Sequence, residues 1–486
     1  MPIIDLPSEN RKIPVEAGEN LLNVLIKGGI YPDAPCGGNG KCGKCKVKVN
    51  GTEVLACKTI VHRDVTVTLP QTESLRILQD DLCSRYSIAP VQEGYLLAFD
   101  IGTTSLVCFL LDGRTGALLA KSSMRNPQTT FGADVITRIQ AALQGALGQL
   151  TAMIRNGMTE LIQTVCDEAG VLPEKIGVIS IVGNPAMQQL FLGISPENLA
   201  RPPFSPVLTE AGVLPCREIL PLCPRAQLLI VPDISGYVGA DTLGCLLATG
   251  LYEADRLTLL VDIGTNGEMV LGDRNRRIAC STAAGPAFEG AKISCGMRGA
   301  DGAVDHVTLT DGEVHYHVLG DVPPRGLCGS GLLDLVAVLL DLGILDESGY
   351  LEGKEFILCD NVVLTQKDIR EVQLAKAAIR AGIELLAEKL GVQVEEIQTV
   401  YLAGAFGNYM NPDSACRIGM IPPVLRNRIH PIGNAAGEGA RLCALSRAEF
   451  DYAMHLAGET EFLELASLPN FQDCYVDALE FEEEES

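Results

Sequence analysis

The sequence contains no segment that could cross a membrane and no leader that would direct export. Its longest apolar stretch, LLDLVAVLLDLGIL, is too short to span a bilayer and includes Asp334 and Asp341. The first residues, MPIIDLPSENRKIPVEAG, contain neither the basic segment nor the apolar core of a signal peptide. We therefore expect a soluble protein that is located in the cytoplasm and has no membrane partner.

Positive charge is also scarce. The chain carries 38 Lys and Arg residues against 61 Asp and Glu residues, which gives a formal net charge of −23. Because nucleic acids and anionic membrane surfaces attract basic proteins, this balance argues against both as partners. The acidic residues Glu482–Glu485 near the end of the chain are expected to form a solvated terminus.

A disulfide framework is not expected, although the chain has 17 cysteines. Without an export signal, so many thiols indicate a reducing cytoplasm, and we expect one with little oxygen. Several cysteines lack the spacing of metal ligands, so we expect packing roles for them: Cys83, Cys280, Cys295 and Cys328.

Four cysteines near the start of the chain do have ligand spacing. They form a C-x5-C-x2-C-x11-C pattern within CGGNGKCGKCKVKVNGTEVLAC. Asn50-Gly51, between KVKV and TEVLA, is a strong hairpin signal that returns the fourth cysteine to the other three. A zinc site or buried free thiols are the alternatives, but zinc usually shows two CxxC-like pairs and only one is present. The pattern predicts a [2Fe–2S] cluster, with four ligands: Cys36, Cys42, Cys45 and Cys57.

The rest of the chain shows an internal duplication. YLLAFDIGTTSLVCFLLDGRTG and LTLLVDIGTNGEMVLGDRNRR each contain a buried strand, an Asp, a Gly-Thr turn and a second strand. This repeat predicts two lobes of similar α/β build. We expect four parts: a cluster domain (1–72), a linker (73–94), a first lobe (95–256) and a second lobe (257–486).

The two turns predict a nucleotide site. Glycines let a turn approach phosphate closely, amides and hydroxyls bind its oxygens, and each Asp can hold Mg²⁺ directly or through water. A Walker loop is absent, because no Lys follows a G-x-x-x-x-G-K-[ST] pattern. We expect the two turns to face each other across a cleft, with these residues: Asp100, Gly102, Thr103 and Thr104, and Asp262, Gly264, Thr265, Asn266 and Gly267.

Two further segments are candidates for the rest of the nucleotide. VYLAGAFGNYM is a buried strand that opens into a turn, Gly404, Ala405, Phe406 and Gly407, suited to pack against adenine and ribose. RGLCGSGLLDLVAVL places Gly329, Ser330 and Gly331 at a helix start, where amides can bind an anion. A plain helix cap is the alternative for this second segment.

These motifs together resemble a known family. DIGTT, DIGTNGE and LAGAFG look like the phosphate-1, phosphate-2 and adenosine motifs of the superfamily of sugar kinases, Hsp70 and actin (ASKHA). NPQTTFGADVITRI, VGNPAMQQLFLG, AAGPAFEGAKISCGM and GLCGSGLLD, with the cluster domain, resemble the ATP-dependent reductive activators of corrinoid proteins. The resemblance implies an α+β β-grasp ferredoxin-like domain followed by a two-lobed α/β ATPase.

The resemblance also implies an activity. Such activators use the [2Fe–2S] cluster, ATP and Mg²⁺ to reduce Co(II) to Co(I) on a partner corrinoid protein of a methyltransferase system, and an upstream low-potential reductant reloads them. Asp100 and Asp262 would hold Mg²⁺ or position water, and Thr103, Thr104, Thr265 and Asn266 would contact phosphate. Glu268 would support the hydrolytic water, with an exposed hairpin residue as the alternative. Whether the chain forms a homodimer stays open.

Some features separate this chain from other members or leave alternatives. Larger members carry an extra middle domain, for which residues 73–94 leave no room. The sequence has no D-x-H-x-x-G run to tether cobalamin, so the corrinoid should belong to the partner; His315 and His317 are expected to be a satisfied surface pair. The alternatives are an activator of another metalloenzyme, a small-molecule kinase with a redox-sensing domain, and a ferredoxin with a structural partner domain.

Overall fold

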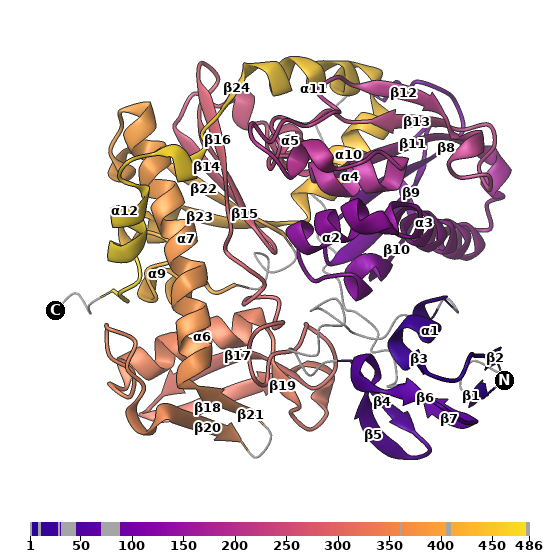
Figure 1. The fold of residues 1–486 in the computed structure, drawn as a ribbon. Helices are drawn as coiled ribbons and strands as arrows, with labels where there is room; N and C mark the ends of the chain where they lie inside the picture. Colours follow the sequence, from indigo (N-terminus) through magenta and orange to yellow (C-terminus); the bar gives the residue numbers. More distant parts are fainter. Residues whose placement is uncertain are drawn as a thin grey trace.

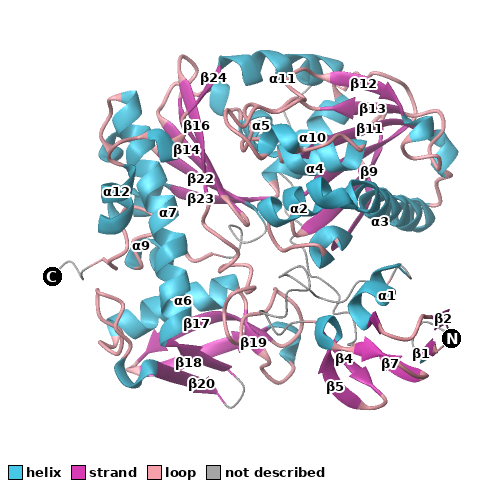
Figure 2. Ribbon diagram, viewed as in Figure 1, coloured by secondary structure: helices cyan, strands magenta, loops and turns pink. Residues whose placement is uncertain are grey.

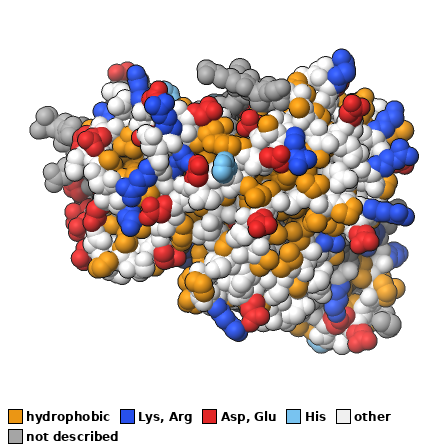
Figure 3. Space-filling model, turned by 90° about the horizontal axis from the view of Figure 1, so that it is seen from above, with side chains coloured by type: hydrophobic (Ala, Val, Ile, Leu, Met, Phe, Trp, Pro, Cys, Tyr) orange, Lys and Arg blue, Asp and Glu red, His pale blue; other side chains and the backbone are white. Residues whose placement is uncertain are grey.

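The computed structural model describes residues 2–7, 11–27, 30, 45–69, 88–359, 362–404 and 410–482. Figure 1 shows a small N-terminal domain and a larger two-lobed body. Among the helices described, none is long and apolar enough to span a membrane. On the face drawn in Figure 3, acidic and basic side chains are interspersed. Oppositely charged side chains also pair at the surface: Arg276 and Lys389 lie 3.7 and 3.8 Å from the carboxylate of Glu461.

The N-terminal domain is a five-stranded sheet covered by one helix. The strands follow the order β2-β1-β7-β4-β5: β1 (Ile3–Leu6), β2 (Arg11–Pro14), β4 (Lys46–Val49), β5 (Thr52–Leu55) and β7 (Val65–Thr68). A short pair, β3 (Glu19–Asn20) and β6 (Ile60–Val61), lies beside it. Helix α1 (Leu21–Lys27) buries Leu21 and Leu25 against sheet residues such as Val47. Asn50 and Gly51 both have positive φ between β4 and β5, as the predicted hairpin requires.

The first lobe is a six-stranded sheet with the order β10-β9-β8-β11-β13-β12. Its strands are β8 (Tyr95–Ile101), β9 (Ser105–Asp112), β10 (Leu118–Arg125), β11 (Ile176–Gly183), β12 (Gly212–Pro215) and β13 (Gln227–Ile230). Three helices pack on one face in a shared apolar core: α2 (Val135–Ala141), α3 (Leu147–Ala169) and α4 (Pro185–Leu192). The β8–β9–β10 segment is an antiparallel meander, and β11 and β13 extend the sheet in parallel.

The second lobe repeats this design, which confirms the predicted duplication. Its order is β23-β22-β14-β15-β16-β24, with β14 (Thr258–Ile263), β15 (Gly267–Gly272), β16 (Arg277–Thr282), β22 (Thr399–Ala403), β23 (Ile429–Gly433) and β24 (Thr460–Phe462). As in the first lobe, three strands (β14, β15 and β16) form an antiparallel meander. Two parallel strands, β22 and β23, extend the sheet beside β14. Helix α7 (Gln366–Leu390) packs on this sheet and begins with a capping box formed by Thr365 and Asp368.

A smaller sheet projects from the second lobe (Figure 2). It consists of β17 (Ala303–Thr310), β18 (Glu313–Val318) and β19 (Gly326–Leu327), with helix α6 (Gly329–Asp341) against it and a hairpin of β20 (Glu355–Cys359) and β21 (Val362–Thr365) nearby. Three helices complete the lobe's chain: α9 (Pro412–Arg417), α11 (Arg447–Glu459) and α12 (Phe471–Asp477).

Two helices pack between the large sheets and join the lobes. Helices α5 (Ala240–Thr249) and α10 (Ala435–Leu445) share one apolar core with inner-face residues of both sheets, including Leu96 and Leu260. The helices cross at Gly244 and Gly439, where a Cβ on Gly439 would overlap the Gly244 backbone. Helix α10 therefore lies within the second lobe in sequence but packs against the first lobe as well.

The end of the linker is fixed to the C-terminus of α10. The amide of Ala89 donates to the carbonyl of Leu445 at 2.8 Å, and the amide of Arg447 donates to the carbonyl of Ala89 at 2.8 Å. This pair of bonds ties the entry to the first lobe to the junction between α10 and α11.

The acidic end of the chain is docked as far as Glu482. Phe481 is buried, and the ammonium group of Lys376 lies 5.2 Å from its ring centroid. The carboxylate of Glu482 forms an ion pair with Arg380 at 2.6 Å. The expected solvated terminus is therefore wrong for Glu482, because cations from a helix 100 residues earlier in the chain hold it; residues 483–486 lie outside the described residues.

Candidate functional site

The two predicted phosphate turns lie against each other. One joins β8 to β9 and the other joins β14 to β15, so each turn is fixed by an antiparallel strand pair. The amide of Gly102 donates to the carbonyl of Ser105, and that of Gly264 donates to the carbonyl of Asn266, both at 2.9 Å. The hydroxyl oxygens of Thr104 and Thr265 lie 3.4 Å apart. The duplicated hairpins thus bring two sets of turn amides and hydroxyls to one place.

Asp100 and Asp262 stand at the ends of the two central strands. Burial, followed by the charge of Asp262, raises the pKa of Asp100 to about 7, while the Asn434 amide donates to its carboxylate at 2.9 Å. Burial also raises the pKa of Asp262 to about 6, and the thiol of Cys245 donates to it at 3.6 Å. The charge of Lys121 offsets only part of the rise for Asp100, so both carboxyls are in an environment that a bound Mg²⁺ would improve.

Two further acids belong to this group. Asp241, in the first turn of α5, has its pKa raised to about 7 by burial and by the charge of Asp262. Glu268 lies opposite Asp262 on β15 and accepts a bond from Ser281 at 3.3 Å; burial and the charges of Asp241 and Asp262 raise its pKa well above its usual range. Sequence reasoning missed Asp241, although an acid in the GADTLG helix start was a visible signal.

The acids do not form a ready-made metal cage. Within the ranges that the structure describes, no three His, Cys, Asp or Glu side chains lie close enough to hold a metal ion. Mg²⁺ normally keeps several waters and takes only one or two carboxylates together with substrate phosphates. This group of acids therefore fits a Mg²⁺ ion that arrives with a nucleotide.

Residues from three other segments hold the first turn in place. The Asn126 side-chain amide donates to the Gly102 carbonyl at 2.8 Å, and the Asn184 amide donates to the Thr103 hydroxyl at 3.0 Å. The buried guanidinium of Arg138 donates to the Thr103 carbonyl, and burial lowers its pKa to about 9. These three residues come from NPQTTFGADVITRI and VGNP, motifs that are distinctive in the sequence but that do not reveal this positioning role.

Glu289 is the other functional residue that sequence reasoning missed. Its carboxylate accepts a bond from the Thr104 hydroxyl at 2.6 Å and another from the Thr265 hydroxyl at 3.0 Å. One side chain thus connects the turns of both lobes. Glu289 lies 24 positions after Thr265 and 185 positions after Thr104, so sequence spacing does not predict these contacts. Its place in the distinctive segment AAGPAFEG was the signal that could have pointed to it.

The adenosine candidates are placed in part. Gly404 has φ +92°, and a Cβ there would lie 2.8 Å from the carboxylate of Asp262, so only glycine fits beside this acid. Ala405, Phe406 and Gly407 lie outside the described residues. Gly329, Ser330 and Gly331 begin α6, where the Ser330 hydroxyl lies 3.4 Å from the Cys328 thiol. Within the described residues we find no hydrogen bond from this helix start to either phosphate turn, so its nucleotide role stays a prediction.

The cluster ligands are also placed in part. Cys45 is buried at the start of β4, Cys57 follows β5, and their sulfur atoms lie 3.2 Å apart without a disulfide. The hairpin of β4 and β5 creates this approach, and two thiols so close together suit neighbouring ligands of one iron ion. Cys36 and Cys42 lie outside the described residues.

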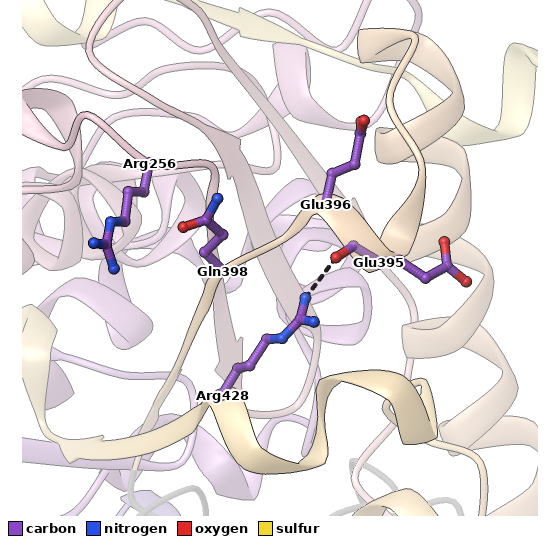
Figure 4. A pocket seen from close by; sticks show the side chains of 5 residues that line it. All are labelled: Arg256, Glu395, Glu396, Gln398 and Arg428. Atoms are coloured by element: carbon purple, nitrogen blue, oxygen red, sulfur yellow. Dashed lines mark hydrogen bonds between the residues drawn. The ribbon is translucent and has the colours of Figure 1, made fainter.

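The polar pocket in Figure 4 is separate from these sites. It is lined by Arg256, Glu395, Glu396, Gln398 and Arg428, and Arg428 donates to the Glu395 carbonyl at 2.6 Å. These residues precede the parallel strands β14, β22 and β23, whereas Asp262 and Gly404 follow the opposite ends of β14 and β22. The pocket therefore lies at the other edge of the sheet.

The histidines of the small sheet are satisfied by acids. His317 lies opposite His306 across β17 and β18, and its ring nitrogen is 2.6 Å from the carboxylate of Asp305. His306 in turn lies 3.2 Å from Asp334. His317 is thus satisfied by an acid, whereas His315 lies opposite Thr308 in the register of the two strands.

Comparison with known proteins links both sites to one family. Three family models match: a 2Fe-2S iron-sulfur cluster binding domain at residues 4–68, the RACo middle region at 95–254 and the C-terminal ASKHA domain of RACo at 256–486. The corrinoid activation enzyme RamQ of Eubacterium limosum is 37% identical over 413 residues, which cover 79% of this chain and 69% of that enzyme. The chain belongs to the family of reductive activators of corrinoid proteins.

Other members agree with this assignment. The [Co(II) methylated amine-specific corrinoid protein] reductase of Methanosarcina barkeri is 26% identical over 421 residues, which cover 80% of this activator and 77% of that protein. A solved structure of a reductive activator for a corrinoid, iron-sulfur protein matches with a TM-score of 0.77 and 28% identity, over 99% of this chain and 98% of that one. The predicted fold, a ferredoxin-like domain followed by an ASKHA-type body, is thereby confirmed.

The family match also corrects one expectation about this activator. The expectation that a middle domain is missing rests on the short segment 73–94, which has no room for one. The model described as the RACo middle region instead matches residues 95–254, which form the sheet from β8 to β13 and helix α5. The middle region is therefore present as the first lobe.

Proposed function

We propose that this activator reduces the cobalt of a partner corrinoid protein from Co(II) to Co(I), and that ATP binding and hydrolysis between the two lobes drive this one-electron step. The observation that carries the proposal is the combination, in one chain, of paired phosphate turns and a ferredoxin-type domain. The partner is the corrinoid protein of a methyltransferase system, and a separate low-potential reductant reloads the activator.

The cysteines fit a [2Fe–2S] cluster. Cys45 and Cys57 supply two thiols 3.2 Å apart, and Cys36 and Cys42 complete the set in sequence. When bound, a plant-type cluster near −400 mV supplies single electrons of low potential. The chain's own contribution is to hold four thiolates in the glycine-rich loop and on the hairpin of β4 and β5.

The nucleotide residues divide into three roles. Asp100 and Asp262 would hold Mg²⁺ or position water, the hydroxyls and amides of both turns would bind phosphate oxygens, and Glu268 would support the hydrolytic water. The phosphate ligands are Gly102, Thr103 and Thr104, with Gly264, Thr265, Asn266 and Gly267. The adenosine moiety would pack against Gly404, Ala405, Phe406 and Gly407, and the helix start at Gly329, Ser330 and Gly331 would bind an anion.

ATP is needed because the electron transfer is uphill. A one-electron gap of about 200 mV corresponds to about 4.6 kcal/mol, and a ligand can shift such an equilibrium only by its different affinity for two states. Helix α10 provides a route for this coupling. Asn434 caps its start and contacts Asp100, while Leu445 at its end bonds to Ala89 in the linker.

An ATPase assay tests the proposal against its main competitor. Turnover should rise when a Co(II) corrinoid protein is added and should not rise with the same protein stripped of its corrinoid. A kinase with a redox-sensing domain predicts stimulation by a small metabolite, with transfer of phosphate to it. Stimulation by such a metabolite but not by the corrinoid protein would contradict the proposal.

A further inference from the structure

Glu289 occupies the position between the two phosphate turns. Its two carboxylate oxygens accept hydrogen bonds from one threonine of each lobe, Thr104 at 2.6 Å and Thr265 at 3.0 Å. The same two hydroxyls lie only 3.4 Å apart. The donors that the sequence motifs assign to phosphate are therefore already used by an acid of the protein itself.

A carboxylate is a reasonable substitute for phosphate at this place. Both groups present two oxygens of similar spacing and negative charge to hydroxyl donors, and such charge-assisted bonds are strong. Two anions cannot share these donors, because their charges repel at contact distance. Arg138 donates to the Thr103 carbonyl; burial lowers its pKa, and the charges of Asp134 and then Glu289 raise it.

The loop that carries Glu289 is anchored away from the turns. The amide and hydroxyl of Ser294 donate to the buried carboxylate of Asp368, at 2.7 and 3.0 Å, in the cap of α7. The amide of Met297 donates to Leu327 in β19 at 2.8 Å. A movement of Glu289 would thus be passed to the start of α7 and to the small sheet.

We propose that Glu289 is an internal placeholder for a nucleotide phosphate: it closes the two turns when no nucleotide is bound, and the arriving phosphate displaces it. This inference rests on the proposed ATP site and adds a regulatory step to it. Nucleotide binding then requires that two hydrogen bonds break. Displacement of the loop would also move the start of α7 and the small sheet, to which the loop is bonded.

The test measures affinity for the non-hydrolysable ATP analogue AMPPNP with Mg²⁺ by calorimetry. Glu289→Gln removes the charge with almost no change of shape, and Glu289→Ala removes both acceptors. Loss of a competing charge-assisted bond should tighten AMPPNP binding about tenfold or more in both variants. Glu313→Gln, an exposed acid on β18, is the matched control and should bind like the wild type.

Thermal unfolding supplies a second readout on the same proteins. The rise in melting temperature at saturating AMPPNP should be larger in Glu289→Gln than in the wild type, because less of the binding energy is used for displacement. A cooperative unfolding transition like that of the wild type shows that the ATPase body of each variant is folded.

Three results would overturn the inference. Equal AMPPNP affinity in the wild type and both variants would refute the placeholder while leaving the ATP site intact. Weaker binding, or unchanged binding with a hundredfold lower turnover, would make Glu289 a nucleotide ligand or a group that acts on water. No nucleotide binding by any of these proteins would refute the proposed ATP site together with the placeholder.

Discussion

At the scale of single residues, the most unusual feature is a group of acids buried close together at the phosphate turns. Asp100, Asp241, Asp262 and Glu268 all have raised pKa values, and burial is the first cause in each. Such a group is unfavourable for the free protein but suits a site that binds a cation with its substrate. The buried acids should therefore lower the free energy of unfolding of the nucleotide-free protein by a measurable amount.

The pH dependence of stability should reveal this cost. Asp262 has a folded pKa of about 6 against an ordinary value of 3.8, so between these pH values the folded state keeps a proton that the unfolded state has lost. Stability of the nucleotide-free protein therefore falls as pH rises through this window, by about 3 kcal/mol from this residue. Asp262→Asn should melt higher than the wild type at pH 7.5 and should lose most of this advantage at pH 4.5.

The same variant tests the role of Asp262 in turnover. ATP hydrolysis should fall by about a hundredfold or more, since Mg²⁺ and phosphate lose a charged partner, while the cluster spectrum stays unchanged. Normal ATPase activity in Asp262→Asn would show that this turn does not bind phosphate.

The cluster ligands are tested by exchanging one thiol. Cys45→Ser should abolish the visible spectrum of the [2Fe–2S] cluster and leave nucleotide binding intact, because the two sites lie on separate sheets. Cys474→Ser, which changes a partly exposed cysteine on α12, is the control and should retain the spectrum. If Cys45→Ser kept it, the ligand assignment would be wrong.

At the scale of elements, the contact between α5 and α10 decides how the lobes are joined. Gly244 and Gly439 let two backbones meet directly, and both helices share the core between the large sheets. A side chain at this crossing has no space, so the helices would have to separate.

Gly439→Ala should therefore destabilise the ATPase body, by about 3 kcal/mol, and lower its melting temperature. Gly458→Ala in α11 is the matched control, because a Cβ there meets no atom within 4 Å; alanine should be neutral or slightly stabilising in that helix. Equal melting temperatures for the two variants would show that the crossing is not tightly packed.

Local elements could be predicted from sequence, whereas their partners could not. The two strand–turn–strand hairpins, the Asn50-Gly51 turn and the cap of α7 all follow from neighbouring residues. Glu289, Arg138 and Asn184 reach the phosphate turns only through the packing of segments far apart in the chain. The docking of Glu482 on Arg380 was missed for the same reason, since a run of acids near the end of a chain gives no sign of a distant cation.

At the scale of the whole molecule, the two sites are connected through α10 and the linker. Asp100 contacts Asn434 at one end of the helix, and Ala89 is bonded to Leu445 and Arg447 at the other. Helix α10 thus contacts the nucleotide site at its start and, at its end, the linker that joins the ferredoxin domain to the first lobe. This arrangement gives a physical basis for coupling ATP to electron delivery.

The most direct test of the account is a spectroscopic assay of cobalt reduction. The complete activator is mixed with a low-potential reductant and a corrinoid protein in the Co(II) state, and the Co(I) absorption is followed with and without Mg²⁺ and ATP, with Asp262→Asn as the control. We predict that Co(I) forms only with ATP and only with the wild-type chain. Formation of Co(I) at the same rate without ATP would contradict the account.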